Sequence, residues 1–202
     1  MHGIAKRFYI SKKTCPNGEI YKYNSDGDII EKIMPNGDIL EYTCAGEYDP
    51  LENTTKKTLA DGTIIEYGGG GHIIKRTFPS GKIREFHTNG IMIKETYPSG
   101  YICEYNNNGK ITRQTFPDDC TQEFNSDGHM IKKSFTNGNV CEYGITGDMV
   151  KRTFPDGTIC EYNCDGHIIK ETSPSGEVRE RDNNGKITKQ ILPDGTIHEW
   201  WF

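Results

Sequence analysis

Glycine recurs along the chain at alternating intervals of nine and ten residues, so the sequence repeats every nineteen residues. Each period contains two turn signals, one of the type Pro155-Asp156-Gly157 and one of the type Cys164-Asp165-Gly166. Asp119 stands where the period would place a further glycine. Between the turns lie five to seven residues rich in Ile, Val, Thr, Tyr and Phe, which is typical of short strands. A repeat that fills the chain decides its architecture before any other feature does.

The repeat predicts an all-β fold, a free-standing single-layer antiparallel β-meander of about twenty short strands with solvent on both faces. Hydrophobic residues make up only 33% of the chain, against roughly 45–50% in typical globular domains. A sandwich or a closed barrel is the alternative, but either would bury charged side chains at a large cost. We expect the repeat domain over 14–202, preceded by an N-terminal strand or arm over 1–13.

Hairpin geometry gives the expected strand register. Pro-Asp-Gly suits a three-residue loop, and Asp-Gly suits a two-residue type I′ loop. With these loops, Glu161 lies between Lys151 and Lys170. The two-residue loop also places Tyr162 opposite Ile169. Opposite charges on neighbouring strands stabilise a sheet by about 0.2–1 kcal/mol per pair, so the sequence specifies the register.

One segment interrupts the period. Gly46 and Gly62 are sixteen residues apart instead of ten, which predicts an inserted loop at about 47–57. Irregular loops on rigid scaffolds often carry function. A tolerated surface insertion without a function is the alternative.

Charge and hydropathy exclude several classes of partner. The formal net charge of −5 argues against a nucleic-acid partner, because such proteins are usually basic. No apolar run approaches the roughly 20 residues that a membrane helix needs. The first residues, Met1-His2-Gly3-Ile4-Ala5-Lys6-Arg7, lack the apolar segment of a signal peptide.

The side chains that usually carry chemistry do not converge. Seven cysteines form no Cys-x-x-Cys pair, and the expected register places Cys160 between Arg152 and Glu171, so we expect reduced thiols in the cytoplasm. His72 and His129 share one repeat position but lie several strands apart, so neither helps to build a metal site. A flat sheet also offers no deep pocket. We therefore expect no catalytic residues, no metal, no cofactor and no enzymatic activity.

The turn motifs, taken with the early insert, resemble those of one known family. They are Pro16-Asn17-Gly18, Met34-Pro35-Asn36-Gly37, Phe78-Pro79-Ser80-Gly81, Phe154-Pro155-Asp156-Gly157-Thr158-Ile159 and Leu192-Pro193-Asp194-Gly195-Thr196-Ile197. Over about 14–202 the chain resembles the C-terminal domain of T-complex protein 10, or G-box domain, which occurs in the centriole-assembly scaffold CPAP. The resemblance implies a non-enzymatic interaction scaffold of the centriole or centrosome, in the cytoplasm.

The resemblance also implies a binding site for a proline-rich segment of a centriolar partner of the STIL/Ana-two type. The peptide would lie across aromatic side chains on one face of the sheet. The matching residues are Tyr23, Tyr42, Tyr67 and Phe86. Tyrosines suit a polyproline II ligand, because their rings pack on prolines and their hydroxyls bond its free carbonyls. The aromatic position recurs at Phe124, Tyr143 and Tyr162, so a purely sheet-stabilising role is the alternative.

Aromatic residues near the two ends of the chain suggest self-association. They are Phe8, Tyr9, Trp200, Trp201 and Phe202. Edge strands leave backbone hydrogen-bonding groups unpaired, so one copy could pair end to end with another. The alternative is that these rings fold over the edge and cover it.

Two other functions compete with the centriolar scaffold. A YD-repeat shell fragment of a bacterial toxin also has units that read Tyr-x-x-x-Gly-x-Ile. That family prefers Tyr-Asp and Gly-Arg-Leu, whereas this chain has Tyr105-Asn106 and Gly109-Lys110-Ile111. The third hypothesis is a purely structural spacer or filament subunit.

Overall fold

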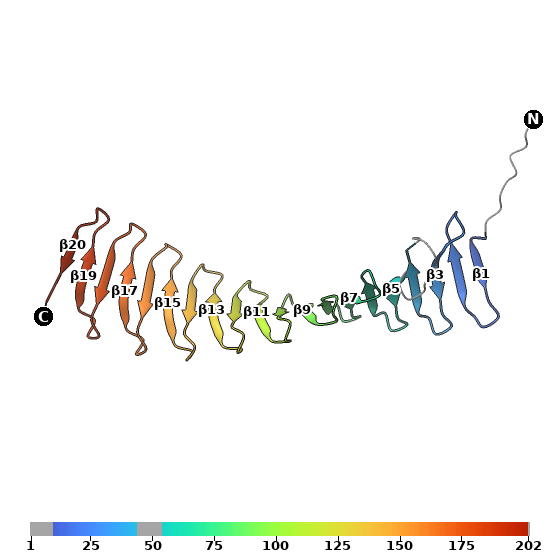
Figure 1. Ribbon diagram of the computed structural model, residues 1–202, viewed down its shortest axis with the longest axis horizontal. Helices are drawn as coiled ribbons and strands as arrows, with labels where there is room; N and C mark the ends of the chain where they lie inside the picture. The colour runs from blue at the N-terminus through green and yellow to red at the C-terminus, as the bar shows by residue number, and fades with distance from the viewer. Residues whose placement is uncertain (1–9, 44–53, 202) are drawn as a thin grey trace, which may run out of the picture. The chain divides into compact units, whose positions relative to one another are not determined.

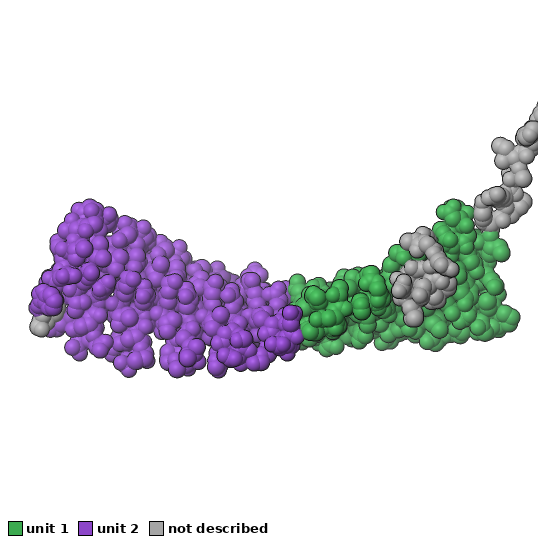
Figure 2. Space-filling model, viewed as in Figure 1, with its two compact units in different colours: residues 1–98 green, residues 99–202 purple. Residues whose placement is uncertain are grey.

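The chain forms a single-layered antiparallel sheet of short strands (Figure 1). The computed structural model describes residues 10–43 and 54–201, and the chain divides into two compact units, 1–98 and 99–202 (Figure 2). The described residues contain twenty strands and no helix. Within each unit a strand contacts only its neighbours in sequence, so no described element covers either face. The predicted fold class is confirmed, whereas the boundary between 13 and 14 stays a prediction.

The strands alternate between longer and shorter segments. Among the described residues, the first unit contains β1 (Lys12–Thr14), β2 (Ile20–Tyr23), β3 (Ile29–Ile33), β4 (Ile39–Tyr42), β5 (Thr54–Thr58), β6 (Ile64–Tyr67), β7 (Ile73–Thr77), β8 (Ile83–Phe86) and β9 (Met92–Thr96). The second unit contains β10 (Ile102–Tyr105), β11 (Ile111–Thr115), β12 (Thr121–Phe124), β13 (Met130–Ser134), β14 (Val140–Tyr143), β15 (Met149–Thr153), β16 (Ile159–Tyr162), β17 (Ile168–Thr172), β18 (Val178–Arg181), β19 (Ile187–Ile191) and β20 (Ile197–Glu199).

Both turn signals form the same loop, so the prediction of two loop sizes was wrong. In the Pro-type turn, Gly157 N donates to Phe154 O at 2.9 Å and Phe154 N donates to Thr158 O at 2.8 Å. The turn at Gly166 repeats both bonds, each at 3.0 Å. A type I′ loop needs positive φ at two residues, but Gly166 is the only residue of its turn with a positive φ, 79°. Each loop is therefore a type I turn closed by a left-handed residue.

The alternation of nine and ten residues comes from the strands instead. Glu161 pairs with Lys170, but Tyr162 pairs with Ile168 rather than with the predicted Ile169. Ile169 is therefore the extra residue of a β-bulge, which the five-residue strand accommodates and the four-residue strand does not. The hairpins at Pro-type turns keep one register throughout, as between β15 and β16.

The register divides the side chains between two faces. Glu161 pairs with Lys151 on one side and with Lys170 on the other, as predicted, and lies 3.3 Å from Lys170 Nζ. We call the face that carries Glu161 and its equivalents the charged face. Cys160 and Tyr162 alternate with Glu161 and point to the other side, which we call the aromatic face.

The sheet has no conventional core. No described large side chain is fully buried. The most buried apolar side chains are Tyr42, Ile65, Cys103, Cys141 and Cys160. All five lie on the aromatic face, so the most buried apolar packing of the sheet is on this face.

The described residues include no helix that is long and apolar enough to cross a membrane.

Candidate functional site

The four aromatic residues of the expected peptide site form one row. Tyr23, Tyr42, Tyr67 and Phe86 are the last residues of β2, β4, β6 and β8. All four strands belong to the first unit. Because equivalent positions point to the same side, the four rings lie on the aromatic face, one on every second strand.

The members of this row differ in exposure. Tyr42 is only 8% exposed, whereas Tyr23, Tyr67 and Phe86 are half-buried. Tyr42 pairs with Thr54, the first described residue after the insert. The described residues on the two sides of the insert therefore lie at the aromatic row. Residues 44–53 lie outside the described residues, and the rest of the predicted loop, 54–57, belongs to β5.

The sheet is tight beside Tyr67. Tyr67 pairs with Ile73 across a bulge, which leaves Ile74 as the extra residue, 36% exposed. A Cβ built on Gly68 would lie 2.9 Å from Ile74 Cγ2, closer than two carbon atoms approach without strain. A side chain at position 68 would therefore have to displace the Ile74 methyl group.

A row of charged residues runs through the middle of the aromatic face. Lys32 Nζ lies 2.7 Å from Glu19 Oε1, and Lys57 Nζ lies 3.0 Å from Asp38 Oδ2. The hydrogen bond from Lys32 lowers the pKa of Glu19, and the hydrogen bond from Lys57 lowers the pKa of Asp38. These pairs hold both lysines flat on the face.

Glu95 on β9 is the most strongly perturbed of these groups. It accepts from Lys82 Nζ at 2.5 Å, Arg84 Nε at 2.8 Å and Tyr97 Oη at 2.5 Å. Glu95 is 5% exposed. Burial raises the pKa of this carboxyl, but the three hydrogen bonds outweigh burial and hold the pKa at about 2. Glu95 is therefore ionised and its two oxygens are occupied.

Two further residues of this row, Arg76 and Arg84, pair directly across β7 and β8. With Phe86, His72 and the turn 88–90 they line a depression of about 460 Å³. They were not among the residues predicted for the site. An alignment of the repeats indicates Arg84, because Ile65, Cys103, Cys141 and Cys160 occupy the equivalent positions in other periods. It does not indicate Arg76, because other periods also carry charged residues at that position.

The aromatic row continues in the second unit. Its members there are Tyr105, Phe124, Tyr143 and Tyr162. Burial raises the pKa of Tyr143 and that of Tyr162, as expected for phenols that pack on the sheet. The aromatic row therefore continues through both units, and the insert distinguishes the first unit.

The residues predicted for self-association are only partly described. Trp200 N donates to Thr188 O at 3.0 Å, and the Trp200 ring meets the His198 ring edge-on at 6.0 Å. Trp200 is 39% exposed and Trp201 is 93% exposed. Phe8, Tyr9 and Phe202 lie outside the described residues.

The described residues contain no group of three or more His, Cys, Asp or Glu that could hold a metal ion. Cys160 pairs with Arg152 and Glu171, as predicted. The described cysteines are all free thiols, and burial raises the pKa of Cys160. His72, His129 and His167 are exposed at the starts of their strands.

Several solved structures are similar to this chain. The TCP10 domain of Danio rerio CPAP is 21% identical, with a TM-score of 0.47, and the match covers 90% of this chain and 99% of that one. The chain is similar to TCP10 domains. A structure of that Danio rerio domain with a peptide of Danio rerio STIL matches 90% of this chain and 98% of that chain at 20% identity and a TM-score of 0.28.

A third similar structure is the Drosophila melanogaster SAS-4 (dCPAP) TCP domain in complex with a proline-rich motif of Ana2. It is 14% identical, with a TM-score of 0.27, over 99% of both chains. No family model and no curated protein matches the chain. A further similar structure, that of TcdB2-TccC3, is 12% identical, with a TM-score of 0.25, over 91% of this chain and 12% of that one.

Proposed function

We propose that the chain is a non-enzymatic interaction scaffold of centriole or centrosome assembly. In this proposal, the aromatic face of the first unit binds a proline-rich segment of a centriolar partner of the STIL/Ana2 type. The turn motifs support it, because they resemble the TCP10 family. The similar TCP10 domains of Danio rerio and Drosophila melanogaster were solved with a STIL peptide and with a proline-rich motif of Ana2.

The spacing of the aromatic row carries this proposal. Neighbouring strands lie about 4.8 Å apart, so residues on every second strand are about 9.6 Å apart. A polyproline II helix has three residues per turn and rises about 3.1 Å per residue, so it repeats every ~9.3 Å. A proline-rich peptide that crosses the strands would therefore present the same side to each successive ring.

Differences in exposure separate the aromatic residues that a ligand can contact from the one that packs beneath the site. Tyr23, Tyr67 and Phe86 keep part of their surface open to a ligand. Tyr42 is buried, so we assign it to the packing beneath the site. Tyr67 and Phe86 are therefore the better residues to change.

The test is peptide binding to single alanine variants. We expect Tyr67→Ala and Phe86→Ala each to weaken binding of a fluorescent STIL- or Ana2-type proline-rich peptide by about tenfold or more, as for buried aromatic anchors at interfaces. Fluorescence anisotropy measures the change. Far-UV circular dichroism shows whether each variant keeps its strands.

The repeat provides a matched control. Tyr162 occupies the equivalent position in the second unit, so Tyr162→Ala removes the same side chain from the same local structure. We expect this variant to bind the peptide as the wild type does. Equal losses in all three variants would remove the proposed site and favour a purely structural role for the row.

The proposal also includes end-to-end association through the edge strand β20. All three residues of β20 are exposed, and the neighbouring Trp201 ring is almost wholly open to solvent. Paired on one side only, to β19, this strand leaves backbone groups free for a second copy.

A further inference from the structure

Arg76 is a charged side chain in an unusual setting on the aromatic face. Its neighbours across the strands are Ile65 on β6 and Arg84 on β8. Neither residue accepts a hydrogen bond through its side chain, and Arg84 carries the same charge. Like charges directly opposite each other destabilise a sheet. The cross-strand neighbours thus provide no compensation for the Arg76 guanidinium.

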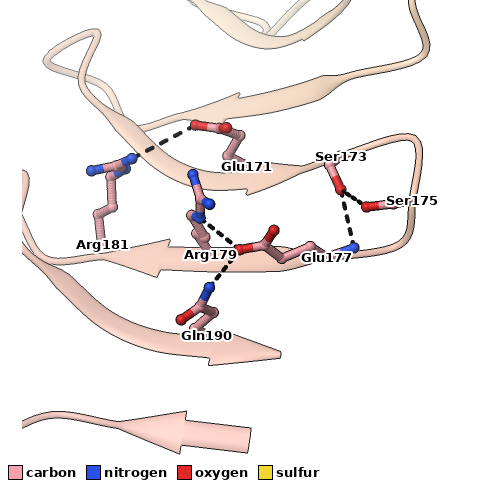
Figure 3. A network of polar contacts seen from close by, with 7 residues as sticks. All are labelled: Glu171, Ser173, Ser175, Glu177, Arg179, Arg181 and Gln190. Carbon is pink, nitrogen blue, oxygen red and sulfur yellow. Dashed lines mark hydrogen bonds and ion pairs between the residues drawn. The ribbon is translucent and has the colours of Figure 1, made fainter. Parts of the chain in front are cut away.

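Four other periods compensate this position from within the chain. A polar side chain thirteen residues earlier, or nineteen across the insert, bonds the residue equivalent to Arg76. The pairs are Lys32–Glu19 at 2.7 Å, Lys57–Asp38 at 3.0 Å, Arg152–Asn139 at 3.0 Å and Gln190–Glu177 at 2.5 Å. Figure 3 shows the last of these, with the Glu177 carboxylate between Gln190 and Arg179.

Thr63 occupies the partner position of Arg76. Its side chain is shorter than Asn, Asp or Glu, and it is only 5% exposed. Among the described residues, Arg76 Nε has no hydrogen bond to Thr63 or to any other residue. In the period of Arg76, the arginine is thus present but its internal acceptor is missing.

One donor of Arg76 is buried without a partner. Its Nε atom has almost no solvent exposure and no hydrogen bond among the described residues. A buried donor without an acceptor costs about 1–3 kcal/mol, and more when it is charged. In the equivalent Arg152, the Nε atom bonds Asn139 Oδ1 at 3.2 Å. The chain therefore leaves at Arg76 a donor that its own side chains do not pair.

The nearby carboxylate of Glu95 is not the acceptor for Arg76 Nε. Glu95 pairs with Arg84 across β8 and β9, and its oxygens are bonded by Lys82, Arg84 and Tyr97. Arg76 and Arg84 instead line the depression that Phe86 borders. The basic pair lies beside the aromatic row, on a chain whose net charge is −5.

We propose that this depression binds the carboxylate of an acidic residue, Asp or Glu, in the proline-rich partner segment. The inference rests on the proposed function, because the segment reaches the depression by following the aromatic row to Phe86. A guanidinium presents planar donors that match a carboxylate, and the paired Arg76 and Arg84 bring two guanidinium groups to this depression. The partner sequence therefore contains an acidic residue next to its prolines.

The experiment compares peptides that differ at one position. A short proline-rich host peptide carries Glu, Gln, Lys or phosphoserine at each position in turn, and its affinity for the full chain is measured by fluorescence anisotropy. We expect one position at which Glu binds about tenfold more tightly than Gln, as for a hydrogen bond to a charged group, and at which Lys binds most weakly.

Two variants of the chain test whether Arg76 is responsible. Thr63→Asp supplies the internal acceptor that Lys57 has in Asp38, and we expect Glu and Gln peptides to bind it equally well. Thr63→Asn, which copies the Asn139–Arg152 pair, should reduce the preference in the same direction. Arg152→Gln is the matched control in the second unit and should retain the full tenfold preference. Thermal unfolding shows that each variant is folded.

The outcomes separate this inference from the proposed function. Binding of the host peptide without any preference for Glu over Gln overturns the acidic contact but leaves the peptide site standing. A preference that survives Thr63→Asp also overturns it. If phosphoserine binds far more tightly than Glu, the ligand of the depression is a phosphate and not a carboxylate. A host peptide that does not bind at all removes both proposals.

Discussion

At the scale of single residues, a one-layer sheet has to provide each charged side chain with water or with a partner. On the charged face, water and the Glu–Lys pairs are sufficient, because both partners of the Lys170–Glu161 pair are about 40% exposed and such pairs contribute little. The aromatic face is drier. There a polar side chain thirteen residues earlier compensates some of the charges, as Asn139 does for Arg152.

We therefore predict that adding an asparagine at this position in one period and removing it from another change the stability of the protein in opposite directions. Thr63→Asn gives Arg76 an acceptor, and we expect the free energy of unfolding to rise by about 1 kcal/mol. Asn139→Thr removes the acceptor of Arg152 and should lower it by about 1–3 kcal/mol. Urea denaturation followed by circular dichroism measures both. Two changes of the same sign would show that the partner position does not govern these arginines.

At the scale of the hairpin, one loop geometry serves the described turns except the one at 68–71, where both Gly70 and Gly71 have a positive φ. The strands absorb the difference in spacing. Glycine closes the turns because their last residue has a positive φ, which side chains with a Cβ adopt at a cost. The described exception is Asp119, with φ of 64°. The turn at Asp119 keeps the hydrogen bond from Asp119 N to Phe116 O, at 2.9 Å.

We predict that Asp119→Gly stabilises the protein by about 0.5–1 kcal/mol, because glycine adopts this conformation without the Cβ penalty. The equivalent turn thirty-eight residues later, two periods on, ends in Gly157 with φ of 89°. Gly157→Asp should therefore destabilise the protein by about 1 kcal/mol. Differential scanning calorimetry compares the two variants with the wild type. A loss of stability in Asp119→Gly would mean that the aspartate side chain contributes more than its backbone strain costs.

These elements show how far the sequence determines the fold. The nineteen-residue period was sufficient for the all-β, single-layer meander and for the neighbours of Glu161 and Cys160. It was not sufficient for Tyr162, because Asp-Gly is compatible with a two-residue loop and with a longer loop that ends in a left-handed glycine. The same interval then arises either from a shorter loop or from a bulge at Ile169, and only coordinates separate the two.

The candidate site was less predictable than the fold. The sequence indicated the aromatic row, because Tyr23, Tyr67 and Phe86 share one repeat position. It did not indicate that Tyr42 is buried, since equivalent residues of a repeat have the same pattern but different neighbours. The unusual environment of Arg76 arises because Thr63 provides no acceptor for its guanidinium. A composition or motif search does not reveal a missing partner.

At the scale of the whole chain, a single-layer sheet has exposed edges that a globular protein would cover. β1 and β20 each pair on one side only among the described residues, and every residue of both strands is exposed. The two edges differ in chemistry. β1 consists of Lys12, Lys13 and Thr14, and lysine at an edge opposes pairing with another chain. Ile197 and Trp201, by contrast, make the β20 end apolar, at 55% and 93% exposure.

This contrast predicts that association, where it occurs, depends on the β20 end. We expect the wild-type chain to increase in average mass with concentration in sedimentation velocity, and Trp201→Lys to stay monomeric over the same range, because a lysine places an unpaired charge at the contact. Ile145→Lys is the control. Ile145 is an apolar residue of a turn in the second unit, 78% exposed, so this variant makes the same change of charge away from β20. If both lysine variants associate as the wild type does, the β20 end is not the contact. If both stay monomeric, net charge governs association instead of the edge.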